Sequence, residues 1–273
     1  MTSASPPHVG SAESGPSPGP WASRPFRLLF AGQTVSAFGN AVTPVAVAFA
    51  VLELGGTATQ LGLVIAAYAS AQVVTTLLGG VLGDRLSRAA LIQGASLASG
   101  VIQAVVAASL IGGWSSLGLL AGAGVLGGIA GSLGGPNFSA LLTETVPAEV
   151  LQRAITWRRL GVNAAMVGGF AAAGLLVAAF GPGWAVAADA LSFLVAAVLY
   201  SLIRVPAASA TPETPHSSLV SDTLAGIREV TRHTWLWVLI AQALVFHLVY
   251  SGAQAVLGPI VVQRTWGEAA WGW

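Results

Sequence analysis

Long apolar runs alternate with short polar segments along the whole chain. A run of about 20 apolar residues is long enough to cross a bilayer as a helix, and seven runs meet this length. They fall at about 27–52, 60–83, 91–112, 117–142, 160–180, 183–203 and 235–262. The fifth and sixth runs are separated only by Gly181-Pro182-Gly183, a turn signal that predicts antiparallel neighbours. The pattern predicts an all-α, multi-pass membrane protein.

The composition strengthens this prediction, because the chain has too few charges for a soluble surface. Charged residues make up 8% of the sequence, apolar residues 55%, and the mean hydropathy is +0.77. A typical soluble protein has about 25% charged residues. Most of the surface is therefore expected to face lipid. The sequence has no cysteine, which excludes disulfides and thiolate metal sites.

The arginines predict the orientation of the chain in the membrane. With the amino terminus in the cytoplasm, ten of the eleven basic residues lie on the cytoplasmic side and only Arg264 lies outside, as the positive-inside rule requires. The ten are Arg24, Arg27, Arg85, Arg88, Arg153, Arg158, Arg159, Arg204, Arg228 and Arg232. The composition, rich in alanine and glycine and with arginine in place of lysine, is typical of a bacterial gene. We therefore expect a bacterial cytoplasmic membrane protein with a cytoplasmic N-terminus.

The polar segments divide the chain into four parts. Residues 1–23 are rich in Ser, Pro and Gly and are predicted to be a disordered cytoplasmic N-terminus. Residues 24–203 form a six-helix transmembrane domain, and 204–234 form a cytoplasmic linker that includes an amphipathic helix at about 219–230. Residues 235–273 are predicted to be the first helix of a second transmembrane half. Six helices, a linker and one further helix suggest a truncated chain.

The segment between the second and third runs carries the most specific motif. Residues 80–88 read Gly-Val-Leu-Gly-Asp-Arg-Leu-Ser-Arg and resemble the signature loop of the major facilitator superfamily. The expected gating residues are Gly80, Gly83, Asp84, Arg85 and Arg88. Glycines let another helix approach closely, and a carboxylate can form a charge-assisted contact that a gate makes and breaks. The alternative is an ordinary interior loop whose arginines only set the topology.

Further segments resemble the drug-efflux or transmembrane secretion effector branch of this superfamily. They include residues 26–33, the Gly135-Pro136 pair and residues 181–193. The resemblance implies the six-helix N-terminal half of a major-facilitator fold, built as two inverted three-helix repeats, plus a seventh helix. Its function would be secondary active transport by alternating access, exporting drugs or other small hydrophobic or amphipathic molecules by proton antiport. Met166 departs from the arginine that many members have in helix five, which counts against an antiporter role for that helix.

Polar side chains recur at spacings of three and four inside three of the apolar runs. They are Gln33, Ser36, Asn40 and Thr43 in the first run, Tyr68 and Gln72 in the second, and His247, Tyr250 and Gln254 in the seventh. Such spacing places the polar groups of each run on one helix face, and facing lipid would be costly. We expect these faces to line a substrate cavity. Hydrogen bonding between packed helices is the alternative.

Two ionisable residues inside the runs are candidates for proton coupling. Asp189 lies about two turns into the sixth run, and His247 lies in the seventh. A carboxylate near a helix amino terminus is also electrostatically favoured, so a structural role for Asp189 stays open. A hydrogen-bonding role for His247 stays open as well.

Two other classes of function were weighed against transport. A membrane-embedded enzyme that uses a metal needs clustered carboxylates, and no two acids have metal-binding spacing within a run. We therefore expect no enzyme activity, no metal and no cofactor. A non-transporting scaffold or sensor, or a half-transporter that assembles as an oligomer, is the remaining alternative. The expected partners are the lipid bilayer, a small-molecule substrate and the missing C-terminal six-helix half, with no nucleic acid.

Overall fold

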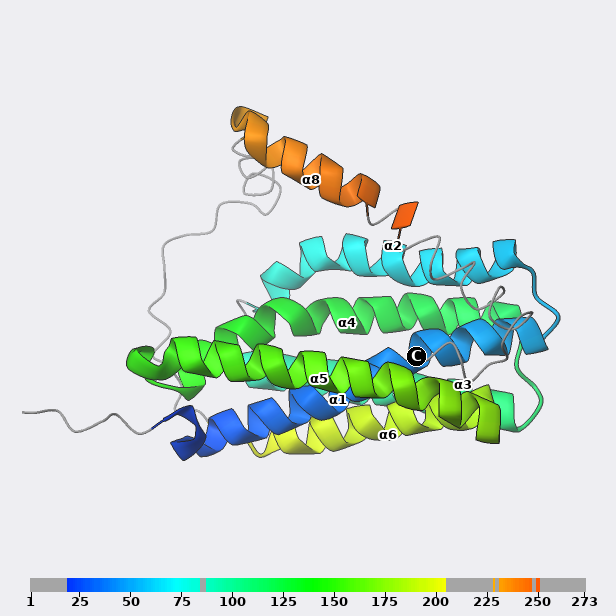
Figure 1. Cartoon of the computed structure of the whole chain (residues 1–273), viewed down its shortest axis with the longest axis horizontal. Coiled ribbons are helices and arrows are strands. Elements are labelled where there is room, and N and C mark those ends of the chain that lie inside the picture. The colour runs from blue at the N-terminus through cyan, green and yellow to red at the C-terminus, as the bar shows by residue number, and fades with distance from the viewer. Residues whose placement is uncertain (1–18, 84–86, 205–227, 229–230, 247–248, 251–273) are drawn as a thin grey trace, which may run out of the picture.

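The computed structural model describes residues 19–83, 87–204, 228, 231–246 and 249–250, and this part of the chain is helical and contains no strand. Its elements are η1 (Pro20–Ala22), α1 (Arg24–Glu53), α2 (Ala58–Gly83), α3 (Arg88–Ile111), α4 (Leu117–Thr145), α5 (Ala148–Phe180), α6 (Pro182–Ser201) and α8 (Thr234–Phe246) (Figure 1). Helices α1 to α6 are long and apolar enough to cross a membrane. The predicted all-α membrane fold is confirmed.

Local signals in the sequence determine where several helices begin and end. Ser23, Ser87 and Ser116 each accept a hydrogen bond from the backbone N–H three residues later, which caps α1, α3 and α4 at their first turns. Gly181 separates α5 from α6 with a φ of 84°, a left-handed conformation that glycine adopts without strain. The predicted tight turn therefore lies where the sequence places it.

The six long helices pack in a pattern that repeats after three helices. Helix α1 packs mainly on α5 and α6, and α4 packs mainly on α2 and α3. Exchanging α1–α3 with α4–α6 turns the first set of pairs into the second, and it maps the extensive α3–α6 contact onto itself. This is the relation expected of two three-helix repeats. Helices α5 and α6 contact each other less than either contacts α1, although a single residue joins them.

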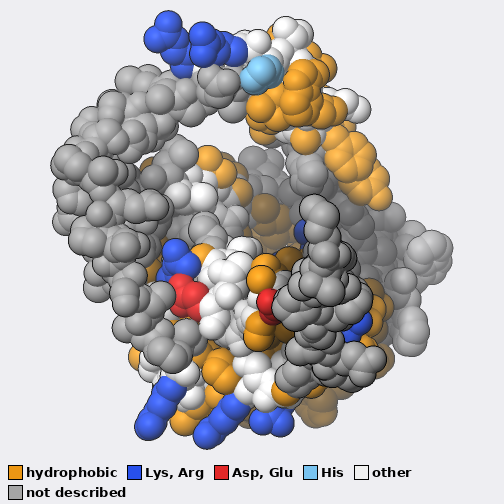
Figure 2. All heavy atoms as spheres, turned by 90° about the vertical axis from the view of Figure 1, so that its left-hand side faces the viewer, with side chains coloured by type: hydrophobic (Ala, Val, Ile, Leu, Met, Phe, Trp, Pro, Cys, Tyr) orange, Lys and Arg blue, Asp and Glu red, His pale blue; other side chains and the backbone are white. Residues whose placement is uncertain are grey.

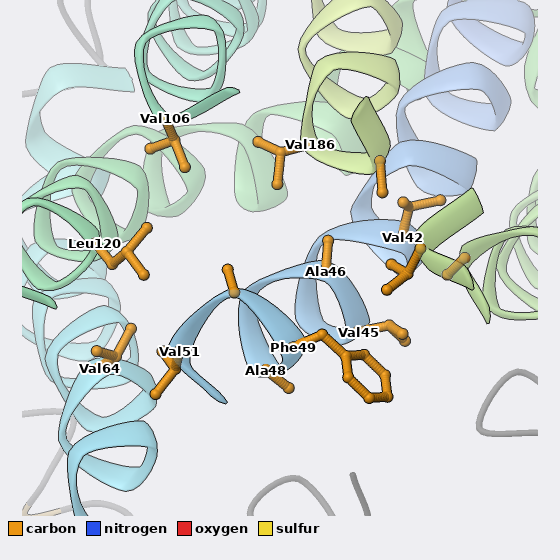
Figure 3. Close-up of a cluster of buried hydrophobic side chains, with 14 of the residues drawn as sticks. Val42, Val45, Ala46, Ala48, Phe49, Val51, Val64, Val106, Leu120 and Val186 are labelled. Atoms are coloured by element: carbon orange, nitrogen blue, oxygen red, sulfur yellow. The ribbon is translucent and has the colours of Figure 1, made fainter. Parts of the chain in front are cut away.

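Two apolar clusters hold the bundle together, one toward each end. The first takes Val42 to Val51 of α1 together with buried residues from all five other long helices (Figure 3). The second takes Phe26 and Leu29 of α1, and Tyr200 of α6, with residues of α3, α4 and α5. The stretch of α1 between Phe30 and Val42 contributes to neither cluster. A layer of different composition therefore lies at the middle of the bundle.

The arginine side chains of the bundle gather at one end. Helices α1, α3 and α5 begin there, and their first turns carry arginines, as does Arg204 after α6. Figure 2 looks at this end, where arginine and acidic side chains surround the ends of the helices. The arrangement is what a positive-inside distribution requires of six alternating spans.

The structure differs from the sequence prediction at two helix boundaries. Helix α5 begins at Ala148, about 12 residues before the predicted start at 160. The prediction counted only apolar residues, whereas the first four turns of α5 carry Arg153, Arg158 and Arg159, which interrupt the apolar run without ending the helix. Residues 20–22, predicted to be disordered, form η1, and the Trp21 ring packs edge-on against Phe26, Phe30 and Trp157.

The seventh predicted run is described only in part. Helix α8 covers Thr234–Phe246 and contributes no buried residue. The remainder of the predicted span to residue 262, and nearly all of the predicted amphipathic helix at 219–230, lie outside the described residues.

Candidate substrate cavity

A cavity of about 280 Å³ lies at the middle of the bundle. Its walls come from α1, α2, α3 and α4, with Phe193 of α6. The polar lining residues are Ser36, Asn40, Tyr68, Gln72, Ser96, Ser99 and Gln103. On α3, these residues lie between Ile92 of one apolar cluster and Val106 of the other. None of the described residues that line the cavity is charged.

Four of the residues predicted from the polar stripes meet in this cavity. Ser36 and Asn40 come from α1, and Tyr68 and Gln72 from α2. The Asn40 amide donates to the backbone oxygen of Ser36 at 2.8 Å, and the Gln72 amide donates to the Tyr68 hydroxyl at 3.4 Å. These bonds stay within one helix, so the side chains keep further hydrogen-bonding capacity for a ligand.

The contribution of α3 was missed by the sequence analysis. Ser96, Ser99 and Gln103 follow spacings of three and four, the same signal that drew attention to α1 and α2. This signal could have identified them. They add a third helix to the polar lining formed by the α1 and α2 residues.

A buried carboxyl group lies behind this lining. Asp189 of α6 is 0% exposed. Its Oδ2 accepts hydrogen bonds from the Thr43 hydroxyl at 2.5 Å and from the Gln103 amide at 2.9 Å, and its Oδ1 accepts from Ser192 at 3.3 Å. The Gln103 amide also donates to Thr43 at 3.0 Å. The network joins α1, α3 and α6 at one point, and Gln103 is its only member that also lines the cavity.

Gly39 makes room for this network. A Cβ atom at position 39 would overlap the Ser192 hydroxyl and the Asp189 carboxylate. Only glycine therefore lets α1 approach α6 closely enough for Thr43 to reach Asp189.

Asp189 is remote from every formal charge on the helices packed around it. Glu53 lies ten residues beyond Thr43 on α1, and Arg88 lies fifteen residues before Gln103 on α3. At about 1.5 Å per helical residue these separations are roughly 15 and 22 Å. The arginines of α5 lie at the far end of the bundle. Among the described residues, the hydrogen-bonding partners of Asp189 are all neutral.

The remaining predicted residue of α1 lies elsewhere. The Gln33 amide oxygen accepts a hydrogen bond from Arg158 of α5 at 3.4 Å, and Gln33 does not line the cavity. The stripe on α1 therefore divides into three functions: Gln33 meets α5, Ser36 and Asn40 face the cavity, and Thr43 meets Asp189.

The signature loop is described only at its edges. Gly80 and Gly83 belong to the last turns of α2, whereas Asp84 and Arg85 lie outside the described residues. Arg88 begins α3 and forms an ion pair with Glu144 near the end of α4, at 2.7 Å. The pair links the two helices at the arginine-rich end of the bundle.

Of the three residues predicted in the seventh run, the structure describes only Tyr250, and Tyr250 does not line the cavity. Tyr250 stacks on Phe246 with ring centroids 5.2 Å apart, and it is exposed. His247 and Gln254 lie outside the described residues. A search of the described residues found no group of three or more His, Asp and Glu side chains that could hold a metal.

Six apolar helices are arranged as two related sets of three, and five of them line a polar cavity with no charged side chain among its described lining residues. This is the architecture of a multi-pass membrane transporter. A family model described as transmembrane secretion effector matches residues 16–272. The chain belongs to this family of the major facilitator superfamily. No curated protein matches the chain.

Proposed function

We propose that the protein is a secondary active exporter of small hydrophobic or amphipathic molecules, drugs among them, and that it exchanges them for protons across the bacterial cytoplasmic membrane. The observation that carries the proposal is the position of Asp189, a buried carboxyl group held by neutral donors directly behind an uncharged cavity. Ionisable groups inside a membrane protein are costly, and they commonly mark ion pathways.

The arrangement suits proton exchange because no fixed cation neutralises Asp189 within the described network. The carboxyl group can alternate between an ionised form, stabilised by Thr43 and Gln103, and a proton-bound form. An arginine partner would hold the ionised form permanently. Of the two residues proposed for proton coupling, Asp189 is therefore our choice over His247.

Alternating access requires a second half of the transporter on the other side of the substrate site. In transporters of this architecture, two halves move about a site that lies between them. We infer that a second six-helix half faces the α1–α6 bundle. A C-terminal six-helix half, as the family resemblance implies, would supply it, and a second copy of the chain in an oligomer is the alternative.

The Asp189→Asn variant tests proton exchange. Asparagine can still accept from Thr43 through its amide oxygen, so the variant should reach the membrane in wild-type amount. Energised efflux of the neutral dye Nile red should fall about fivefold or more, since a coupling free energy of 1–3 kcal/mol is lost. The measurement is dye efflux from pump-deficient bacteria that express the natural gene, with and without a protonophore.

Equilibrium exchange of the dye in vesicles is the control, because it needs substrate movement but no proton gradient. The variant should retain this exchange. Wild-type, protonophore-sensitive efflux by Asp189→Asn would show that protons do not move through this carboxyl group. Loss of exchange together with efflux would indicate a structural role.

A further inference from the structure

We propose that Gln103 is the residue through which the cavity acts on Asp189, and that it selects an uncharged substrate which donates a hydrogen bond to the Gln103 amide oxygen. The inference rests on the proposed function of Asp189 as the proton carrier. It adds a coupling residue and a class of substrate that neither the sequence pattern nor the family assigns.

The two ends of the Gln103 amide have different surroundings. Its nitrogen donates to Thr43 at 3.0 Å and to Asp189 at 2.9 Å. Its oxygen accepts no hydrogen bond from the described residues. It is also not one of the fully buried polar atoms that lack a partner, so the oxygen is accessible. Because Gln103 lines the cavity, the oxygen is the end that a ligand can reach.

The orientation of the Gln103 amide determines whether substrate and proton binding oppose or favour each other. A donor that binds the amide oxygen polarises the amide and strengthens donation from its nitrogen, because hydrogen bonds in a chain reinforce one another. The strengthened bond stabilises the ionised form of Asp189. Substrate binding then favours proton release, and by reciprocity a proton on Asp189 weakens substrate binding. This negative coupling is what exchange requires.

The lining of the cavity points to the same class of substrate. Its polar groups are hydroxyls and amides, and Tyr68, Phe138 and Phe193 add aromatic faces. A cation would find no carboxylate at the surface, since Asp189 is fully buried behind Gln103. The lining therefore fits a neutral molecule with an apolar body and at least one O–H or N–H group.

The pH dependence expected of this coupling belongs to Asp189. The charged groups on the packed helices are Arg24, Arg27 and Glu53 on α1, Arg88 on α3, and Glu149 and the arginines of α5, all toward the ends of the bundle. The other titratable groups are the hydroxyls of Tyr68 on α2 and Tyr200 on α6. Tyrosine stays neutral near pH 7. A pH effect on binding between pH 5 and 8 that Asp189→Asn removes therefore reports on this carboxyl group.

Binding of two matched neutral probes to the chain in lipid nanodiscs tests the inference. The probes are 7-(2-hydroxyethoxy)-4-methylcoumarin and its methyl ether, which differ only in the O–H donor. The alcohol should bind about 3- to 10-fold more tightly than the ether, the effect of one neutral hydrogen bond. Its affinity should rise with pH, and its binding should release protons into a weakly buffered solution. The ether should show neither effect.

Two cavity variants separate coupling from simple contact. In Gln103→Leu, the alcohol should bind no better than the ether, and the pH dependence should vanish. In Gln72→Leu, which loses a cavity amide bonded to Tyr68 rather than to Asp189, binding should weaken while the pH dependence remains. A pH dependence of probe binding that is retained in Gln72→Leu shows that a cavity amide can be removed without unfolding the chain.

The outcomes distinguish the inference from the proposed function. Three outcomes overturn the inference alone. The two probes bind equally, neither probe binds, or the pH dependence of binding survives in Gln103→Leu but not in Asp189→Asn. A pH dependence of binding that survives in Asp189→Asn contradicts Asp189 as the proton carrier. Full coupling in the wild type, lost in both Gln103→Leu and Asp189→Asn, supports both.

Discussion

At the scale of single residues, the α1–α6 contact depends on a position without a side chain. Gly39 faces Asp189 and Ser192 so closely that any Cβ would overlap both side chains. The Thr43–Asp189 bond, one turn further along α1, requires this approach. The buried carboxyl group and the glycine opposite it therefore form one structural unit.

We expect Gly39→Ala to destabilise the bundle. An extra methyl group in a packed interface costs about 1–3 kcal/mol, because the neighbouring atoms have to move. Here the neighbours are a carboxylate and a hydroxyl held in a network. The measurement is thermal unfolding in detergent, and the midpoint should fall.

Gly122→Ala is the matched control, because a Cβ at position 122 of α4 would meet nothing within 4 Å. Alanine is the better helix former by about 1 kcal/mol, so this variant should be as stable as the wild type or slightly more stable. Equal stability of Gly39→Ala and Gly122→Ala would contradict the close approach.

At the scale of helices, the Arg88–Glu144 pair joins the start of α3 to the end of α4. Its side chains are 43% and 26% exposed, so water and salt screen the attraction, and the pair contributes about 1 kcal/mol or less. Its position beside the signature loop suggests a role in gating rather than in stability.

Charge reversal at this pair tests that role. Arg88→Glu places two acids together. It should impair efflux from bacteria that express the natural gene, while the unfolding midpoint of the protein should change little. The double variant Arg88→Glu with Glu144→Arg restores opposite charges and should recover most of the efflux. Dye efflux normalised to the amount of protein in the membrane is the measurement. If the double variant stays as impaired as the single one, Arg88 acts through another partner.

How accurately the sequence predicted each helix depends on how continuous the apolar run of that helix is. Helices α1 and α6 are apolar almost throughout, and their ends lie within a few residues of the predictions. Helix α5 was predicted about 12 residues short, because Arg153, Arg158 and Arg159 interrupt its apolar pattern without ending the helix.

The cavity shows the same limit. Spacings of three and four grouped Ser36 with Asn40 and Tyr68 with Gln72, and each pair lines the cavity because its two residues share one helix face. The same rule cannot say which helix a face will meet. Thr43 and Asp189 are 146 positions apart, and only the packing of α1 on α6 brings them together.

At the scale of the whole molecule, the bundle has one arginine-rich end and one end nearly free of charge. The arginine-rich end holds the starts of α1, α3 and α5 and the ends of α2, α4 and α6. The α1–α2 connection, with the exposed Thr57, lies at the opposite end. The positive-inside rule predicts that the first end lies in the cytoplasm, and this prediction concerns the entire set of six helices.

Single cysteines test this orientation, and the chain has none of its own to interfere. We expect Gly10→Cys and Pro215→Cys to resist an impermeant thiol reagent in intact cells and Thr57→Cys to react with it. Permeabilising the cells should make all three react, which controls for buried positions. Reversed labelling of all three positions would mean that the molecule has the opposite orientation. Labelling of position 215 alongside 57 would mean that an even number of crossings separates them, whereas α2 to α6 give five. The first five helices after Thr57, α2 to α6, are all needed to return the chain to the cytoplasm before residue 215. Labelling from outside at both positions would therefore show that one of these five does not cross the membrane.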